Sequence, residues 1–239
     1  MTGRFEGKVV LVAGGTGALG RAVALSFLNE SAAVVVTFRR QDEFARLSAA
    51  AGERASHLNG HQADVTDPDA TSELIAKIVA DRGRIDVLVN AVGGYAGGTP
   101  LWQITPEVFD RMFALNLRSG YALCRAVVPV MLNQGCGSIV NVASRSAFDH
   151  AAGAAAYGAS KAAAVAMIDS LAADLKGKGV RVNSVVPSIF DTEANRAAMP
   201  KADFARWPKP EDIARVILFL SSDDARLIHG AAIPVYGDT

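Results

Sequence analysis

Tyr157 and Lys161 are the residues whose types and spacing best suit acid–base chemistry. They stand at positions i and i+4 of a segment with helical periodicity, so both side chains lie on one helical face. A tyrosine hydroxyl has an ordinary pKa of about 10, and a neighbouring cation lowers such a pKa because it favours the phenolate. The pair alone is modest evidence, because a lysine can follow a tyrosine at this spacing by chance. Ser144 strengthens it, since Ser144 follows the apolar run 139–142 at the expected sheet edge where open α/β folds bind ligands.

A glycine-rich loop lies between an apolar run at 9–12 and a helix expected over 21–30. Glycine permits a positive φ and a close approach of the backbone, and the helix start then offers free N–H groups to a pyrophosphate. An ordinary strand-to-helix turn can also contain such glycines, but the strand–loop–helix setting favours a dinucleotide site. The residues that we expect at the phosphates are Gly14, Thr16, Gly17, Leu19 and Gly20.

Arg39 and Arg40 end the second strand-like run, at the place where NAD enzymes keep a carboxylate for the ribose 2′-OH. Two arginines there can bind a 2′-phosphate with charge-assisted hydrogen bonds, so the sequence favours NADP(H) over NAD(H). The alternative is that both arginines only cap the strand at the surface. Asp64 and Val65 close a third expected strand, and the Asp64 carboxylate could accept a hydrogen bond from an adenine amino group or cap the helix that begins at Pro68.

Short apolar runs recur along the chain and alternate with segments of helical period, which is typical of repeated βαβ units. We therefore predict an α/β fold with a single doubly wound parallel β-sheet, Rossmann-like and of about seven strands, with helices on both faces. No linker, charge block or repeat divides the sequence, so residues 1–239 are expected to form one domain. The expected strands include 9–12, 34–36, 85–89, 138–142, 180–186 and 232–235, and the expected helices include 21–30, 68–82, 105–132, 157–176 and 210–221.

Charge and composition exclude several classes of function. The 24 Lys and Arg residues balance 24 Asp and Glu residues, so the chain lacks the positive field that binds nucleic acid or anionic lipid. The run 9–20 is too short and too rich in glycine to span a bilayer, and the first residues carry no secretion pattern, so we expect a cytoplasmic protein. Cys124 and Cys136 make no disulfide framework, and the four histidines lack metal-ligand spacing, so no metal is predicted.

These motifs together resemble the short-chain dehydrogenase/reductase family, in its single-domain form, and the resemblance covers nearly the whole chain. Asn116, Ser144 or Thr192 alone could be a structural polar residue, but all of them at matching positions are improbable by chance. The matching features, in family order, are the glycine loop, Asp64, Asn90-Ala91-Val92-Gly93, Asn116, Ser144, Tyr157 with Lys161, Pro187 to Thr192, and the tail from Pro210.

The resemblance implies a tetrad of Asn116, Ser144, Tyr157 and Lys161 beside a bound nicotinamide. Tyr157 would exchange a proton with a carbonyl or alcohol oxygen as hydride is transferred, and Ser144 would stabilise that oxygen. Lys161 would lower the pKa of Tyr157 and hold the nicotinamide ribose, and Asn116 would position a water in a proton relay. Further residues implied at the cofactor are Asn90, Pro187, Ile189 and Thr192, the last at the carboxamide.

The sequence departs from the family pattern at Ala18, where glycine is usual and a Cβ could crowd the pyrophosphate. Ala91 also lacks a side-chain amide that commonly braces neighbouring strands. Residues 188–208 are expected to form a short substrate loop. Its large apolar side chains either cover the nicotinamide or pack the loop itself, and they are Phe190, Met199, Phe204 and Trp207.

We therefore predict an NADP(H)-dependent oxidoreductase that transfers hydride between nicotinamide and a small-molecule carbonyl or secondary alcohol. One alternative is a non-catalytic NADP-sensing protein, against which the complete tetrad speaks. Another is a sugar-nucleotide-modifying relative, for which the chain after Thr192 is short. A homodimer or homotetramer is expected through the helices at 105–132 and 157–176, where small residues allow close helix approach: Ala159, Ala162, Ala163 and Ala166.

Overall fold

Seven parallel strands form one sheet in the computed structural model, which describes residues 3–239. Their order in space is β3-β2-β1-β4-β5-β6-β7. The chain therefore builds the sheet outward from β1 in one direction and then from β4 in the other, which leaves a ligand-binding crevice at the carboxyl ends of these two strands. The strands are β1 (Val9–Ala13), β2 (Ala33–Phe38), β3 (Leu58–Gln62), β4 (Val87–Asn90), β5 (Gly137–Val142), β6 (Val180–Pro187) and β7 (Ala232–Val235).

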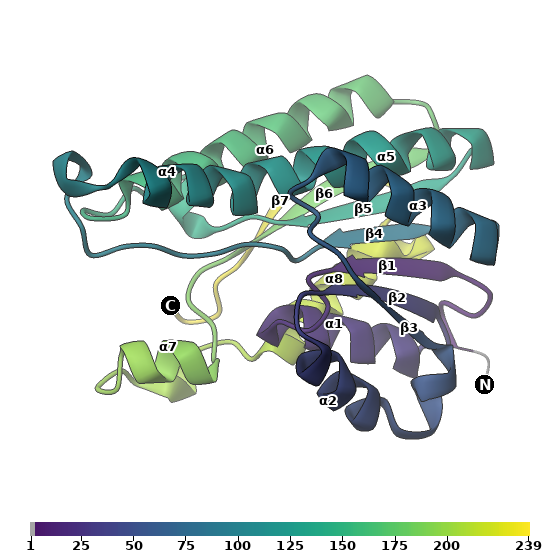
Figure 1. The fold of residues 1–239 in the computed structure, drawn as a ribbon, viewed down its shortest axis with the longest axis horizontal. Coiled ribbons are helices and arrows are strands. Elements are labelled where there is room, and N and C mark those ends of the chain that lie inside the picture. Colours follow the sequence, from purple (N-terminus) through teal and green to yellow (C-terminus); the bar gives the residue numbers. More distant parts are fainter. Residues whose placement is uncertain (1–2) are drawn as a thin grey trace.

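Helices cover both faces of this sheet, as Figure 1 shows, and the predicted fold class is confirmed. One face packs against α1, α2 and α8, and the other packs against α3, α5 and α6. The main helices are α1 (Ala18–Asn29), α2 (Gln41–Ala51), α3 (Pro68–Arg82), α4 (Pro106–Phe113), α5 (Ser119–Gln134), α6 (Ala155–Leu175), α7 (Glu193–Ala198) and α8 (Pro210–Ser221).

The strand β1 shows why its run of apolar residues is continuous and does not alternate with polar ones. Val10 and Val12 lie in the core beside α1 and α8, whereas Val9 and Leu11 lie in the core beside α3 and α5. Because both faces are covered, every position of β1 is buried. A strand buried on both sides needs apolar residues at each position, and the sequence pattern reflects this.

The long helix expected over 105–132 is interrupted by one wide turn. Residues 114–118 form a π-helical turn between α4 and α5, and Asn116 lies in the middle of it. Such turns shift the side chains that follow by about one position and recur at functional sites. The interruption is invisible in the sequence because Ala114 and Leu115 have ordinary helical preferences.

The third strand ends earlier than predicted. β3 stops at Gln62, so the expectation that Asp64 and Val65 close it is wrong. The helix starts at Pro68 as expected, and its cap is Asp67, the residue directly before that proline. The Asp67 side chain accepts hydrogen bonds from the N–H groups of Asp69 (2.8 Å) and Ala70 (3.2 Å). A carboxylate at this position satisfies backbone donors that the helix itself leaves free.

Candidate active site

The residues of the expected tetrad gather at the carboxyl ends of β4 and β5. Ser144 lies two residues after β5, and Tyr157 and Lys161 lie one turn apart in the first turns of α6. The Lys161 side chain crosses back to the sheet, where its Nζ donates a hydrogen bond to the carbonyl oxygen of Val142 (2.9 Å). Lys161 is thus buried at the sheet edge, while Tyr157 is half-buried beside it.

Asn116 reaches the same place from the π-helical turn. Its Oδ1 accepts a hydrogen bond from the N–H of Gly94 (2.9 Å), and its Nδ2 donates to the carbonyl oxygen of Gly94 and to Oγ of Ser160 (3.0 Å each). A Cβ built on Gly93 would lie 3.0 Å from Oδ1 of Asn116 and 3.4 Å from Nζ of Lys161. Asn116 and Lys161 therefore flank the same stretch of backbone after β4, and Asn116 holds it in place.

Burial shifts the pKa values of the two central groups in opposite directions. It raises the pKa of Tyr157 above 10.0; the Ser144 hydroxyl opposes this shift as a hydrogen-bonding neighbour, and Tyr95 adds to it. Burial also lowers the pKa of Lys161 from 10.5 to about 8. Both effects follow from the cost of a charge in a poorly solvated place. Burial of Tyr157 thus acts against the lowering of its pKa that is expected from Lys161, and the net shift is upward.

Tyr95, in the segment that follows β4, is a further neighbour of the site. Its ring packs edge-on against the ring of Tyr157, with 4.9 Å between centroids and 76° between planes. Nevertheless, 69% of Tyr95 is exposed. No motif identifies this residue, because the contact joins two segments far apart in the chain.

The glycine loop between β1 and α1 is held in a defined conformation. Gly14 has a φ of 74°, and its N–H donates to Oγ1 of Thr37 (2.9 Å), which fixes the turn after β1. A Cβ on Gly20 would collide with the carbonyl oxygen of Gly14, so only glycine fits at this close contact. Gly17 caps α1 without any side-chain hydrogen bond, so the first N–H groups of α1 stay available to an anion. Ala18, the departure from the family pattern, is exposed at this helix start, and Leu19 is buried beneath it.

The two arginines after β2 differ in their surroundings. Arg40 is held by Asp42 through two hydrogen bonds (3.1 and 2.9 Å) and lies 3.8 Å from Glu43. Glu43 in turn accepts a hydrogen bond from the Thr16 hydroxyl of the glycine loop (3.0 Å). Arg39 is exposed and takes part in none of the ion pairs found within residues 3–239. Arg40 is thus held by carboxylates beside the glycine loop, whereas Arg39 forms no ion pair within residues 3–239, although its charge contributes to the lowered pKa of the Asp64 carboxyl.

Asp64 and Asn90 are two further residues that the sequence places at the cofactor, and both have partners in the structure. Asp64 does not cap α3, because its Oδ1 accepts from the N–H and the hydroxyl of Thr66 (3.0 and 2.7 Å), which hold the pKa of the Asp64 carboxyl below its ordinary value. The Asn90 amide donates to Oδ1 of Asn141 on β5 (3.1 Å). This hydrogen bond joins the neighbouring strands β4 and β5. The two strands are therefore linked through side-chain amides even though Ala91 has none. Val65 is buried in the core.

Comparison with known proteins decides the family. The family model described as short chain dehydrogenase matches residues 8–203. The chain belongs to the short-chain dehydrogenase/reductase family. Members of this family are oxidoreductases that act on alcohols or carbonyl compounds with nicotinamide cofactors, and the prediction of the family and of the reaction class is confirmed.

Three relatives illustrate the range of this short-chain dehydrogenase/reductase family. The 3-oxoacyl-(acyl-carrier-protein) reductase FabG of Thermotoga maritima is 34% identical, over 98% of each chain. The structure of ElxO with NADP bound superposes with a TM-score of 0.90 at 28% identity, over 96% of this chain and 97% of ElxO. An NAD⁺-bound xylitol dehydrogenase superposes with a TM-score of 0.91 at 26% identity, over 98% and 99%. Close structural neighbours therefore include proteins with either cofactor.

The expected substrate loop of this short-chain dehydrogenase/reductase is closed at its base, where the N–H of Asp191 donates to the carbonyl oxygen of Pro208 (2.8 Å). Trp207 is buried and packs against Phe204 (4.9 Å between centroids), and Phe190 packs against the core beside α1 and α8. Met199 is 40% exposed. The sequence left open whether these apolar side chains cover the nicotinamide or pack the loop itself. Packing accounts for all of them except Met199.

Three expected cofactor residues lie at the start of this loop. Pro187 ends β6 and is buried, and Ile189 is half-buried just after it. Thr192 caps α7, because its Oγ1 accepts from the N–H of Asn195 (3.1 Å). Figure 1 shows α7 outside the two helix layers, at the same end of the molecule as α4. The Thr192 oxygen thus caps the helix as an acceptor, and the hydrogen of the same hydroxyl can still be donated to another group.

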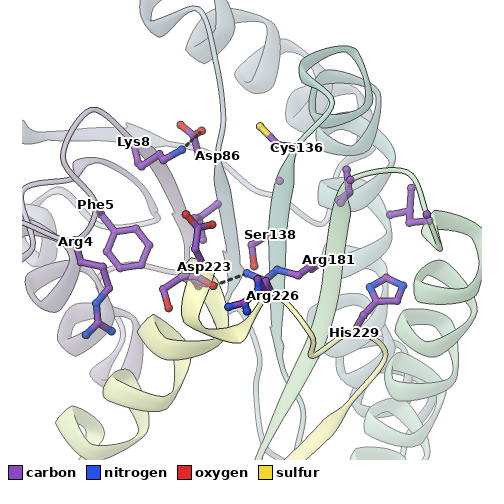
Figure 2. Close-up of a pocket in the computed structure, with 18 residues that line it drawn as sticks. Arg4, Phe5, Lys8, Asp86, Cys136, Ser138, Arg181, Asp223, Arg226 and His229 are labelled. Atoms are coloured by element: carbon purple, nitrogen blue, oxygen red, sulfur yellow. Dashed lines mark hydrogen bonds and ion pairs between the residues drawn. The ribbon is translucent and has the colours of Figure 1, made fainter.

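The cavity of about 450 Å³ shown in Figure 2 is not the active site. It lies at the amino ends of β1, β4, β5 and β6, whereas the tetrad lies at the carboxyl ends. Arg181 projects into this region and donates to the carbonyl oxygens of Leu220 (2.7 Å), Ser222 (3.0 Å) and Ala225 (3.2 Å). It therefore satisfies the carbonyl groups at the end of α8, and the polar lining is explained by the fold.

The part of the chain that the structure describes offers neither a membrane-spanning helix nor a metal site. None of the helices within residues 3–239 is long and apolar enough to cross a membrane. In the same range, no three His, Cys, Asp or Glu side chains come together in a way that could hold a metal ion.

Proposed function

We propose that this enzyme is an NADP(H)-dependent reductase of carbonyl compounds that also oxidises the corresponding secondary alcohols. The observation that carries the proposal is the meeting of Ser144, Tyr157 and Lys161 at the strand ends, directly beside a glycine loop that fits a dinucleotide. The bound nicotinamide supplies the hydride chemistry. The protein's own residues hold the cofactor, orient the carbonyl group and move the proton.

Tyr157 is the proton donor in the proposed reduction. Because burial raises its pKa, the phenol stays protonated at neutral pH and can give its proton to the carbonyl oxygen. The Ser144 hydroxyl lies beside Tyr157 and donates a hydrogen bond to the same oxygen, which stabilises the negative charge that develops there. Oxidation of an alcohol needs the phenolate instead and is favoured as the pH rises.

Lys161 returns a proton to Tyr157 after each turnover. Its pKa of about 8 lies close to neutral pH, so both its charged and its neutral forms are accessible. Asn116 holds the Gly94 backbone beside Lys161 and so keeps the space next to Nζ in shape. We assign Lys161 and Asn116 to the proton path that the family resemblance implies.

The test of the proposed activity is oxidation of NADPH and NADH in the presence of ketones, aldehydes, quinones and β-ketoacyl thioesters. We expect turnover with at least one class and a higher kcat/KM with NADPH. Absence of any turnover, while NADPH still binds, would favour the non-catalytic sensor.

Arg39 is expected to determine the preference for NADPH. It is exposed and forms no ion pair within residues 3–239, whereas Arg40 is already bound to Asp42. A charge-assisted hydrogen bond contributes about 1.5–3 kcal/mol, so Arg39→Ala should raise the Kd for NADPH by about 10- to 100-fold. The Kd for NADH should change by less than about twofold, since NADH has no 2′-phosphate.

Arg40→Ala is the matched control for this prediction. We expect a smaller rise in the Kd for NADPH than with Arg39→Ala, because the Arg40 guanidinium is paired with Asp42. Titration of cofactor fluorescence measures the Kd of each protein for NADPH and for NADH. Equal losses for NADPH and NADH in the Arg39 variant would refute a role in binding the 2′-phosphate.

We also propose that the enzyme pairs with a second copy through the outer surface of α4, α5 and α6. These helices lie side by side in Figure 1, and a shallow hollow on them is lined mainly by apolar side chains that include Phe113, Leu117 and Met167. Nearby, Tyr121 is 49% exposed. Light scattering should give the mass of a dimer or tetramer, and Tyr121→Glu should lower it, whereas a monomeric wild type would contradict the proposal.

A further inference from the structure

Tyr95 has one side against the catalytic tyrosine and another side open to solvent. The edge-on contact with Tyr157 has a centroid distance of 4.9 Å, and 69% of Tyr95 remains exposed. An aromatic ring so placed can contact whatever binds next to the Tyr157 hydroxyl. Tyr95 is therefore positioned to contact the part of a substrate that flanks its reacting carbonyl group.

The backbone around Tyr95 is held in place from both sides. The preceding residue, Gly94, is bound to Asn116 through both its N–H and its carbonyl group. After it, Gly97 lies so close that a Cβ there would collide with the Tyr95 hydroxyl. Further along, the N–H of Thr99 donates to the carbonyl oxygen of Gly153 (3.4 Å), which ties the segment to the chain between Ser144 and α6. The position of the ring thus depends on this local structure.

The segment that carries Tyr95 has no charge. Residues 91–105 contain no Asp, Glu, Lys, Arg or His, and they include two further exposed apolar side chains, Leu101 (62%) and Trp102 (84%). Phe148, which follows Ser144, is 55% exposed. A substrate with a charged group near its carbonyl would meet no opposite charge from this segment, whereas a flat uncharged group can stack on an aromatic ring.

We propose that Tyr95 is a specificity-determining residue that contacts the substituent of the carbonyl carbon and makes the enzyme prefer planar, uncharged aromatic ketones over flexible aliphatic ones. This inference rests on the proposed function. Aromatic pairs contribute about 0.5–1.5 kcal/mol beyond the burial of their area, which is about a 2- to 13-fold effect on affinity. The ring and not the hydroxyl makes this contact, so phenylalanine should replace tyrosine.

The test compares acetophenone with 2-octanone, an aliphatic methyl ketone of the same carbon number. For Tyr95→Ala we expect kcat/KM for acetophenone to fall about 10-fold, mainly through KM, and that for 2-octanone to fall by less than about threefold. Tyr95→Phe should restore acetophenone to within about twofold of the wild type. Trp102→Ala, a change of another exposed aromatic residue in the same segment, is the matched control and should not reproduce the selective loss.

Three results of these kinetic measurements would contradict the proposed role of Tyr95. An equal loss for both ketones, a Tyr95→Phe variant as impaired as Tyr95→Ala, or the same selective loss in Trp102→Ala would overturn the assignment. If the wild type reduces neither ketone, calorimetric titration of acetophenone into the NADP⁺-loaded protein decides the matter. Weaker binding to Tyr95→Ala supports the role of Tyr95 even though the proposed activity has failed, and unchanged or absent binding refutes it.

Discussion

Tyr157→Phe should lower kcat for carbonyl reduction by about 10³-fold, within the range of about 10² to 10⁴ that general acid catalysis contributes. The substitution removes the hydroxyl that donates the proton and keeps the ring that packs against Tyr95. Because the fold and the glycine loop are unaffected, the Kd for NADPH should change by less than about threefold. Steady-state kinetics and fluorescence titration of NADPH measure the two effects separately.

Tyr121→Phe provides the matched control for this prediction. It also removes one phenol hydroxyl, but from the outer surface of α5, away from Ser144 and Lys161. We expect kcat within about twofold of the wild type, in contrast to the general-acid loss of about 10³-fold. Turnover that survives Tyr157→Phe would contradict the proposed mechanism, in which the Tyr157 hydroxyl gives its proton to the carbonyl oxygen.

Lys161→Met should abolish most of the activity and at the same time change how stability depends on pH. Burial lowers the pKa of Lys161 from 10.5 to about 8, so below pH 8 the folded protein carries a charged ammonium in a poorly solvated site. Between pH 8 and 10.5 the unfolded state binds more protons than the folded state, and this contribution to stability therefore rises with pH. The wild type gains stability from this residue as the pH increases through that window.

Methionine has no such titration, so the difference between the two proteins isolates the effect of the lysine. One pKa unit corresponds to about 1.4 kcal/mol, and the shift therefore predicts a gain of roughly 3 kcal/mol for the wild type relative to Lys161→Met between pH 7 and 10.5. Urea unfolding at several pH values measures it. The hydrogen bond to Val142 is lost at every pH and does not alter the trend.

Lys178→Met is the control, since Lys178 is exposed in the turn between α6 and β6. Its free energy of unfolding relative to the wild type should be nearly constant across the same pH range. A difference between wild type and Lys161→Met that does not vary with pH would mean that Lys161 titrates near its ordinary value in the folded protein. Lys161 could then not serve as the proton carrier near neutral pH.

Several features of the site escaped the sequence for identifiable reasons. Arg39 and Arg40 are equivalent as neighbouring residues, and only the position of Asp42 in the first turn of α2 separates them. Asp64 could either cap α3 or meet an adenine by sequence alone, and the structure excludes the first role because Asp67 is the cap. Tyr95 had no motif, since its contact with Tyr157 depends on how the segment after β4 crosses the strand ends.

The amino-acid sequence by itself determined the fold class and the family, and it singled out the four residues that we propose as the tetrad. Apolar runs buried on both faces, helical periodicity and a glycine loop are local patterns, so they can be read without knowing which elements meet. Only the tertiary structure decided the directions in which the pKa values of Tyr157 and Lys161 shift, because desolvation depends on everything packed around a group. The structure also decided the pairing of Arg40, because the sequence leaves the directions of neighbouring side chains open. The placement of Asn116 in a π-helical turn and the contact of Tyr95 with Tyr157 depend on segments that are distant in sequence.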